Sequence, residues 1–149
     1  MVAFVTAGAG FLLAVLWFDL MFDVQVLAHR DGAVPEGVLA SISGYYRRVT
    51  TAARPMNRLI ATVMLATLAA LVVEVARAEP MQWVAWVSLA LAAAPFALAG
   101  ARIVPMAVRL GARADAPERQ SELARAIFRD HVICTASILV LLVLQLSFA

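Results

Sequence analysis

The sequence predicts an all-α, polytopic membrane protein whose single domain, residues 1–149, is a bundle of four transmembrane helices. Two observations indicate this class. Apolar residues make up 64% of the chain, against roughly 45–50% in a typical soluble domain, and the mean hydropathy is +0.89. The apolar residues also gather into blocks close to the ~20 residues that a helix needs to cross a bilayer. Because lipid offers no hydrogen-bond partner to the backbone, spans of this length are expected to be helical.

Four apolar blocks define the predicted spans. They cover residues 2–28, 56–76, 82–104 and 126–148. The first block has no basic residue before His29, and its apolar run exceeds the ~7–15 residues of a signal peptide, so we expect a mature span. The link "RAEPM" between the second and third blocks predicts a tight connection. Trp83 and Trp86 follow it, where amphipathic rings favour the outer interface.

Arginines set the predicted orientation. They concentrate in the loop between the first two spans and in the loop between the last two. Loops rich in arginine stay on the cytoplasmic side of the membrane. We therefore expect a multi-pass protein of the bacterial inner membrane with both termini on the periplasmic side. The net charge is only +2, and no basic run is interleaved with aromatics, so no nucleic-acid partner is expected. The single cysteine, Cys134, excludes an internal disulfide.

The two arginine-rich loops also contain helical patterns. In "PEGVLASISGYYRRVT", Val38, Ile42, Tyr45 and Val49 recur at helical spacing, which predicts an interfacial helix in the first cytosolic loop; an irregular loop is the alternative. In "DAPE" of the second loop, Asp115 and Glu118 have the spacing of a capping box around Pro117. The fourth helix is therefore expected to begin in the cytosol and to run unbroken into the membrane.

Two aspartates lie deep within the first span, in "FDLMFD". Asp19 and Asp23 are four residues apart and share one face of a helix. If the span ends near His29, they lie about 15 Å and about 9 Å inside the cytosolic boundary. Because ionised carboxylates avoid lipid, this face is predicted to point into the bundle.

The other spans place polar residues at the same depth. The fourth span contributes Asp130, His131 and Cys134, the second enters with Arg54, Asn57 and Arg58, and the third leaves with Arg102. We expect these groups to form one polar pocket, open to the cytosol or the inner leaflet and closed on the outer side, where Glu74 is interpreted as an interfacial residue. The candidate catalytic residues are Asp19, Asp23 and His131, and the candidate ligand-binding residues are Asn57, Arg58, Arg102, Asp130 and Cys134.

The leading functional hypothesis is a pocket for a lipophilic ligand, aromatic or quinone-like, with proton-transfer or oxidoreductase chemistry. Asp19 and Asp23 would move a proton, while Arg58, Arg102 and His131 would position an anionic or carbonyl group. Purely structural ion pairs would account for the same residues. The further alternatives are a non-catalytic accessory or oligomer-forming subunit of a larger membrane complex, and a proton-coupled carrier that acts as an oligomer.

No cofactor follows from the residues alone. The acids, histidines and cysteine are suitable metal ligands, but neither HExxH nor the paired ExxH of di-iron bundles occurs. We therefore assign no metal site, and a haem between His29 and His131 remains an alternative. Membrane lipids are the expected surroundings, with a lipophilic small molecule as the expected ligand.

The order of these parts resembles that of the anthrone-oxygenase-like small four-helix integral membrane proteins. The likeness rests on Trp17 in the first helix, "ARPMNRLI" at the end of the first loop, "IVPMAVRLG" at the end of the third helix and "FRDHVICTAS" in the fourth. It implies a four-helix membrane fold and, from the characterised members, cofactor-independent oxygenation of polycyclic aromatics. The histidine that ends "VQVLAHR" gives a second, more distant resemblance, to the four-helix protoporphyrinogen-oxidase membrane family.

Overall fold

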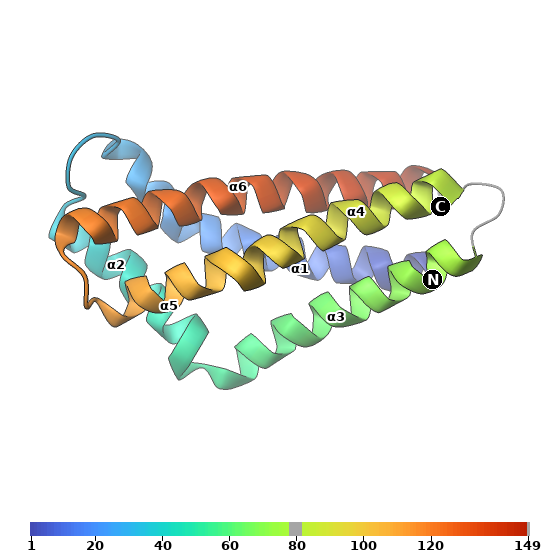
Figure 1. Ribbon diagram of the computed structural model, residues 1–149, viewed down its shortest axis with the longest axis horizontal. Helices are drawn as coiled ribbons and strands as arrows, with labels where there is room; N and C mark the ends of the chain where they lie inside the picture. Colours follow the sequence, from blue (N-terminus) through green and yellow to red (C-terminus); the bar gives the residue numbers. More distant parts are fainter. Residues whose placement is uncertain (78–81, 149) are drawn as a thin grey trace.

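The computed structural model describes residues 1–77 and 82–148, and these residues form helices and short connections without a strand (Figure 1). The α-helices are α1 (Val2–Asp23), α2 (Glu36–Arg47), α3 (Arg54–Arg77), α4 (Gln82–Leu98), α5 (Val104–Ala112) and α6 (Pro117–Phe148). A 3-10 turn, η1 (Val24–Ala28), extends α1. Two π-helical segments follow α2 and α4, namely η2 (Arg48–Ala52) and η3 (Ala99–Ile103).

Four helical runs in the described part of the chain are long and apolar enough to cross a membrane: Val2–Ala28, Pro55–Arg77, Gln82–Ala112 and Pro117–Phe148. This confirms the prediction of four such helices. The third run is longer than the predicted 82–104 because α5 continues it beyond η3. Most of the predicted tight link "RAEPM" lies outside the described residues.

The long helices pack into a bundle. α6 lies along α1 and α4, α3 packs on α1 and α4, and α2 packs on α5. In Figure 1, α3 diverges from α4 toward its residue 54 end, and α2 with α5 occupies that end of the molecule. Many large apolar side chains, such as Phe4, Leu65 and Leu146, are exposed on the outside of the bundle. An apolar surface of this extent suits contact with lipid.

Two glycines allow close approaches between helices. A Cβ at Gly8 of α1 would collide with the Thr67 hydroxyl on α3. A Cβ at Gly111 of α5 would lie 2.8 Å from the backbone nitrogen of Arg47, at the end of α2. Gly111 therefore fixes how closely α2 can approach α5, which matters because α2 carries two tyrosines of the site described below.

Two local predictions need correction. Asp115 is not the N-cap of α6, because the helix begins at Pro117 directly after Ala116; the Asp115 carboxylate accepts two hydrogen bonds from Arg109 at 2.7 and 2.6 Å. The buried face of α2 is also rotated from the predicted stripe. It consists of Leu39, Ile42, Ser43 and Tyr46, since α2 is covered from two sides, by α5 and by α1 with α6.

Candidate functional site

A cavity of about 340 Å³ lies between α1, α2, α3, α4, α5 and α6. Most of its lining is apolar, for example Leu12, Ile60 and Phe96. The polar part of the wall consists of Asp19, Tyr45, Tyr46, Thr50, Asn57, His131 and Cys134. Both π-helical segments contribute to the lining, η2 through Val49 and Thr50 and η3 through Ala99 and Ile103. Such segments occur frequently at functional sites.

Four lining residues mark where the cavity reaches the surface of the bundle. Phe18 of α1, Met56 and Asn57 of α3 and Val104 of α5 line the cavity, and all four are exposed. The exposed part of the lining is therefore apolar except for the amide of Asn57, and none of these four side chains is charged.

Four residues of the polar wall and the buried Asp23 behind them form a connected group of side chains, which we name the cavity cluster: Asp19, Asp23, Tyr45, Tyr46 and His131. Tyr45 Oη donates to Asp19 Oδ1 at 2.7 Å, and Tyr46 Oη donates to Asp23 Oδ1 at 2.6 Å. His131 Nδ1 lies 2.7 Å from Asp23 Oδ2. Two acids of α1 are thus joined to α2 and α6 through hydroxyl and imidazole groups. No arginine belongs to the cluster.

The histidine in this cluster has two distinct nitrogens. Asp23 is fully buried, and its carboxylate accepts from Nδ1, so we assign the proton of the neutral ring to Nδ1. The Nε2 atom lies 3.7 Å from Asp19 Oδ2, which is too long for a hydrogen bond. Nε2 and Asp19 Oδ2 therefore flank one position where a polar atom of a ligand can contact both.

The two tyrosines remain hydrogen-bond donors. Burial, followed by the charge of Asp19, raises the pKa of Tyr45 far above its ordinary value. Burial, followed by the charge of Asp23, likewise raises the pKa of Tyr46 above its ordinary value. Both hydroxyls therefore stay protonated and hold the carboxylates in place at any physiological pH.

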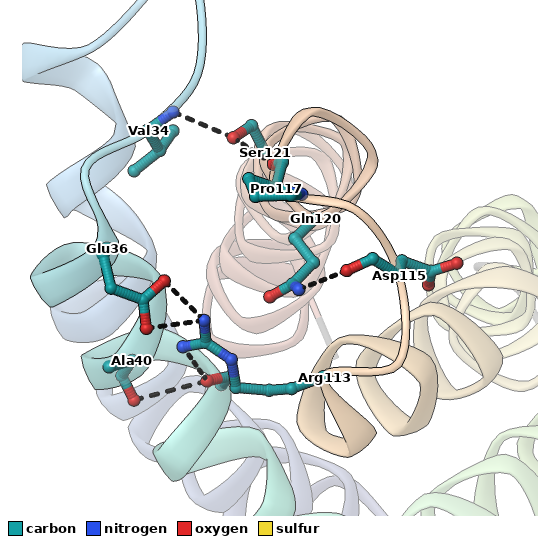
Figure 2. Close-up of polar contacts among 9 residues, drawn as sticks. Val34, Glu36, Ala40, Arg113, Asp115, Pro117, Gln120 and Ser121 are labelled. Atoms are coloured by element: carbon teal, nitrogen blue, oxygen red, sulfur yellow. Dashed lines mark hydrogen bonds and ion pairs between the residues drawn. The ribbon is translucent and has the colours of Figure 1, made fainter.

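Polar contacts fix the position of α2 against α5 and α6 (Figure 2). Arg113, which has a left-handed backbone at the end of α5, donates to both carboxylate oxygens of Glu36 at 2.8 and 2.7 Å. The Val34 amide donates to Ser121 Oγ at 2.8 Å, and Arg113 also reaches Ser43 at 3.4 Å. These contacts and the close approach at Gly111 position Tyr45 and Tyr46 toward α1.

A second group of side chains lies apart from the cavity, and we name it the boundary cluster: Arg102, Arg129 and Asp130. Arg102 Nε lies 2.7 Å from Asp130 Oδ2, and Arg129 Nε lies 3.5 Å from Asp130 Oδ1. None of the three lines the cavity. The predicted single pocket is therefore two clusters, because adjacent residues of α6 face different neighbours: His131 faces α1 and α2, whereas Asp130 faces η3.

The remaining predicted site residues divide between the cavity and the surface. Asn57 and Cys134 line the cavity; Asn57 donates to the Thr50 carbonyl at 3.2 Å, and Cys134 Sγ donates to the Pro95 carbonyl at 3.9 Å. Arg58 is exposed and does not line the cavity. The Arg54 side chain lies outside the described part of the structure.

The two tyrosines were missed as site residues. The sequence pattern placed Tyr45 on an apolar stripe and gave Tyr46 no role. The adjacent pair "YY", in an amphipathic segment that follows two intramembrane acids, is the signal that could have indicated hydroxyl donors for those acids.

The end of the bundle opposite α2 also holds an internal polar contact. Gln145 Nε2 donates to Glu74 Oε2 at 3.1 Å and to Ser88 Oγ at 3.0 Å. Glu74, expected at the interface near Arg77, is thus partly buried against α4 and α6. This contact joins three helices but does not line the cavity.

Among the described residues, no three histidine, cysteine or acidic side chains gather closely enough to hold a metal ion. His29 does not line the cavity that His131 faces, and its carbonyl accepts from Arg125 at 2.8 Å. The polar groups that line the cavity are one imidazole, one carboxylate, two phenols, and the side chains of Thr50, Asn57 and Cys134, with Asp23 behind His131. No protein-family model, curated protein or solved structure matches the chain.

Proposed function

We propose that this chain is a multi-pass protein of the bacterial inner membrane that binds a lipophilic ligand, aromatic or quinone-like, in the cavity and exchanges a proton with it. The convergence of His131 Nε2 and Asp19 Oδ2 on one position of an apolar cavity carries the proposal. Both groups can contact a hydroxyl or carbonyl of a ligand whose rings fill the apolar remainder.

The membrane placement follows from the arginines. The loops that contain α2 and the start of α6 face the cytosol, and both termini face the periplasm. In this placement α2 lies at the cytosolic interface, and the first turns of α6 extend into the cytosol. The cavity then lies in the inner half of the bilayer, and the ligand reaches it sideways from the inner leaflet, past Phe18, Met56 and Val104.

The residues of the cavity cluster have different roles in the proposed proton transfer. His131 Nε2 accepts a proton from a ligand hydroxyl, and the resulting imidazolium is stabilised by Asp23 on Nδ1 and by the nearby Asp19. Asp23, which is fully buried, orients the ring and fixes its tautomer. Arg58 and Arg102 take no part, since neither reaches the cavity.

Direct binding tests the proposal. The protein in lipid nanodiscs is titrated with a benzoquinol that carries a decyl tail and with the corresponding quinone, and binding is read from quenching of tryptophan fluorescence. Ala99 of η3 lines the cavity, whereas Ala97 of α4 is exposed and does not. Ala99→Phe should fill the cavity and abolish binding, and Ala97→Phe should bind like the wild type.

The polar site is tested in the same titration. Asp19→Asn and His131→Gln should each weaken binding of the quinol about tenfold, through loss of a hydrogen bond to a charged or buried partner worth about 1.5 kcal/mol. If Ala99→Phe binds as well as the wild type, the ligand does not occupy the cavity. If neither probe binds and the purified protein contains no extractable small molecule, the accessory-subunit alternative is favoured.

A further inference from the structure

The boundary cluster presents two arginines in an arrangement that leaves part of each guanidinium free. The Asp130 side chain is only 4% exposed, whereas those of Arg102 and Arg129 are 46% and 63% exposed. Each arginine contacts the carboxylate most closely through Nε, at 2.7 and 3.5 Å. The terminal amino groups make no hydrogen bond to another residue of the described chain. The buried acid therefore anchors both side chains and leaves their outer donor edges available.

Both arginines lie at the same depth. The rings of Trp83 and Phe148 are in contact, with centroids 5.9 Å apart, so the start of α4 and the end of α6 are level. Arg102 follows Trp83 by 19 residues, and Arg129 precedes Phe148 by 19 residues. At ~1.5 Å per residue each arginine is about 28 Å from that contact, which matches the ~30 Å hydrocarbon core. With the contact between Trp83 and Phe148 placed at the outer boundary of the hydrocarbon core, both arginines lie at its inner boundary, within reach of the phosphates of the inner leaflet.

Charge and shape favour a phospholipid as the occupant. Two guanidinium groups and one carboxylate leave a net charge of +1, which complements a phosphodiester. Ile133 is one helical turn beyond Arg129 toward the outer side, and Val140 continues that face; their exposed fractions are 50% and 52%. A lipid whose phosphate contacts the arginines can lay an acyl chain along this apolar strip.

We propose that Arg102 and Arg129 form a binding site for the phosphate of an anionic phospholipid of the inner leaflet. Arginine suits this role because its planar donor edge matches two phosphate oxygens. The proposal rests on the membrane placement given above and is independent of any ligand in the cavity.

Native mass spectrometry of the detergent-purified full chain tests the site, with phosphatidylglycerol and phosphatidylcholine as probes. The wild type should retain phosphatidylglycerol more strongly than phosphatidylcholine. The double variant Arg102→Gln, Arg129→Gln should bind phosphatidylglycerol about tenfold more weakly, because two charge-assisted contacts are lost. The control Arg119→Gln, in an exposed pair with Glu122 near the start of α6, should bind like the wild type.

A second variant separates lipid binding from folding. Asp130→Asn keeps both arginines, leaves an amide oxygen that can still accept from Arg102 Nε, and raises the net charge of the cluster, so it should retain phosphatidylglycerol at least as well as the wild type. Equal retention of phosphatidylglycerol by the double variant and the wild type would overturn the proposal, as would displacement of the lipid by inorganic phosphate at equal concentration. Failure of the wild type to insert into nanodiscs would instead refute the membrane placement. The cavity variant Ala99→Phe should leave lipid retention unchanged.

Discussion

The cavity cluster and the boundary cluster start from adjacent residues of α6, yet they hold their acids in different ways. In the cavity cluster, Asp23 is fully buried and is held by Tyr46 and His131 at 2.6 and 2.7 Å. In the boundary cluster, Asp130 is held by two arginines whose side chains are about half exposed or more. The comparison separates neutral donors inside the bundle from permanent cations at its edge.

The difference has a physical reason. An arginine deep in an apolar bundle would carry a charge that cannot be neutralised by proton loss, and its burial is costly unless it is fully paired. Tyrosine hydroxyls satisfy a buried carboxylate without adding a charge. A histidine adds a charge only when it takes up a proton. The cavity cluster can therefore change its protonation, whereas the boundary cluster keeps a fixed positive charge.

The largest expected difference in stability is between variants of the two buried acids, Asp23 and Asp130. Asp23→Ala removes the fully buried carboxylate that both the Tyr46 hydroxyl and His131 Nδ1 contact, and leaves these two groups only their longer mutual contact of 3.4 Å, so the free energy of unfolding should fall by about 3 kcal/mol. Asp130→Ala leaves two arginines that can remain hydrated at the interface, and the loss should be about 1 kcal/mol. Unfolding of both variants in mixed micelles, titrated with sodium dodecyl sulfate, measures the two values. Equal losses would remove the distinction between the clusters.

The next effect concerns the helix that presents the tyrosines. Gly111→Ala places a methyl group against the backbone of Arg47, and the forced shift of α2 should cost about 2 kcal/mol. Quinol binding should weaken as well, because Tyr45 and Tyr46 move with α2. Lipid binding at the boundary cluster should be unchanged. The matched control is Gly44→Ala on α2, where a Cβ meets nothing within 4 Å and helix stability should rise slightly.

A smaller effect is expected from the hydroxyls themselves. Tyr46→Phe should destabilise the protein by about 1.5 kcal/mol, because it removes a hydrogen bond to the fully buried Asp23. Tyr45→Phe should cost less, about 1 kcal/mol, because Asp19 faces the cavity and can find another partner there. Thermal unfolding of both variants in the same detergent shows which of the two is less stable. The reverse order would mean that Asp19, and not Asp23, is the structural acid.

The smallest effect on stability is expected in the boundary cluster. Arg102→Gln should change the free energy of unfolding by less than about 1 kcal/mol, since its side chain is 46% exposed and the ion pair is screened by solvent. In that variant Asp130 keeps its contact with Arg129. A loss as large as that of Asp23→Ala would show that Arg102 stabilises the bundle in the same way as the buried groups.

The sequence predicted the four long helices well because lipid-spanning length and apolarity are properties of each segment alone. The sequence also predicted that Asp19, Asp23 and His131 point into the bundle, since charged side chains avoid lipid. The sequence could not show that Asp130 and His131 belong to different clusters. Adjacent residues of a helix point ~100° apart, and the packing of η3 and α1 against α6 decides which neighbour each side chain contacts. The tyrosines were missed because their role depends on how α2 folds back against α1, which Gly111 and the contact between Glu36 and Arg113 control.

Nitrogen NMR of His131 tests the central claim most directly. The chain has two histidines, so His29→Gln leaves a single imidazole whose two nitrogen signals can be assigned. We predict that the neutral ring carries its proton on Nδ1, that Asp23→Asn disturbs this tautomer, and that adding the decyl benzoquinol shifts the Nε2 signal. A neutral ring protonated on Nε2, or an Nε2 signal that does not respond to the quinol, would contradict the proposal that His131 is the proton-exchanging group of the cavity.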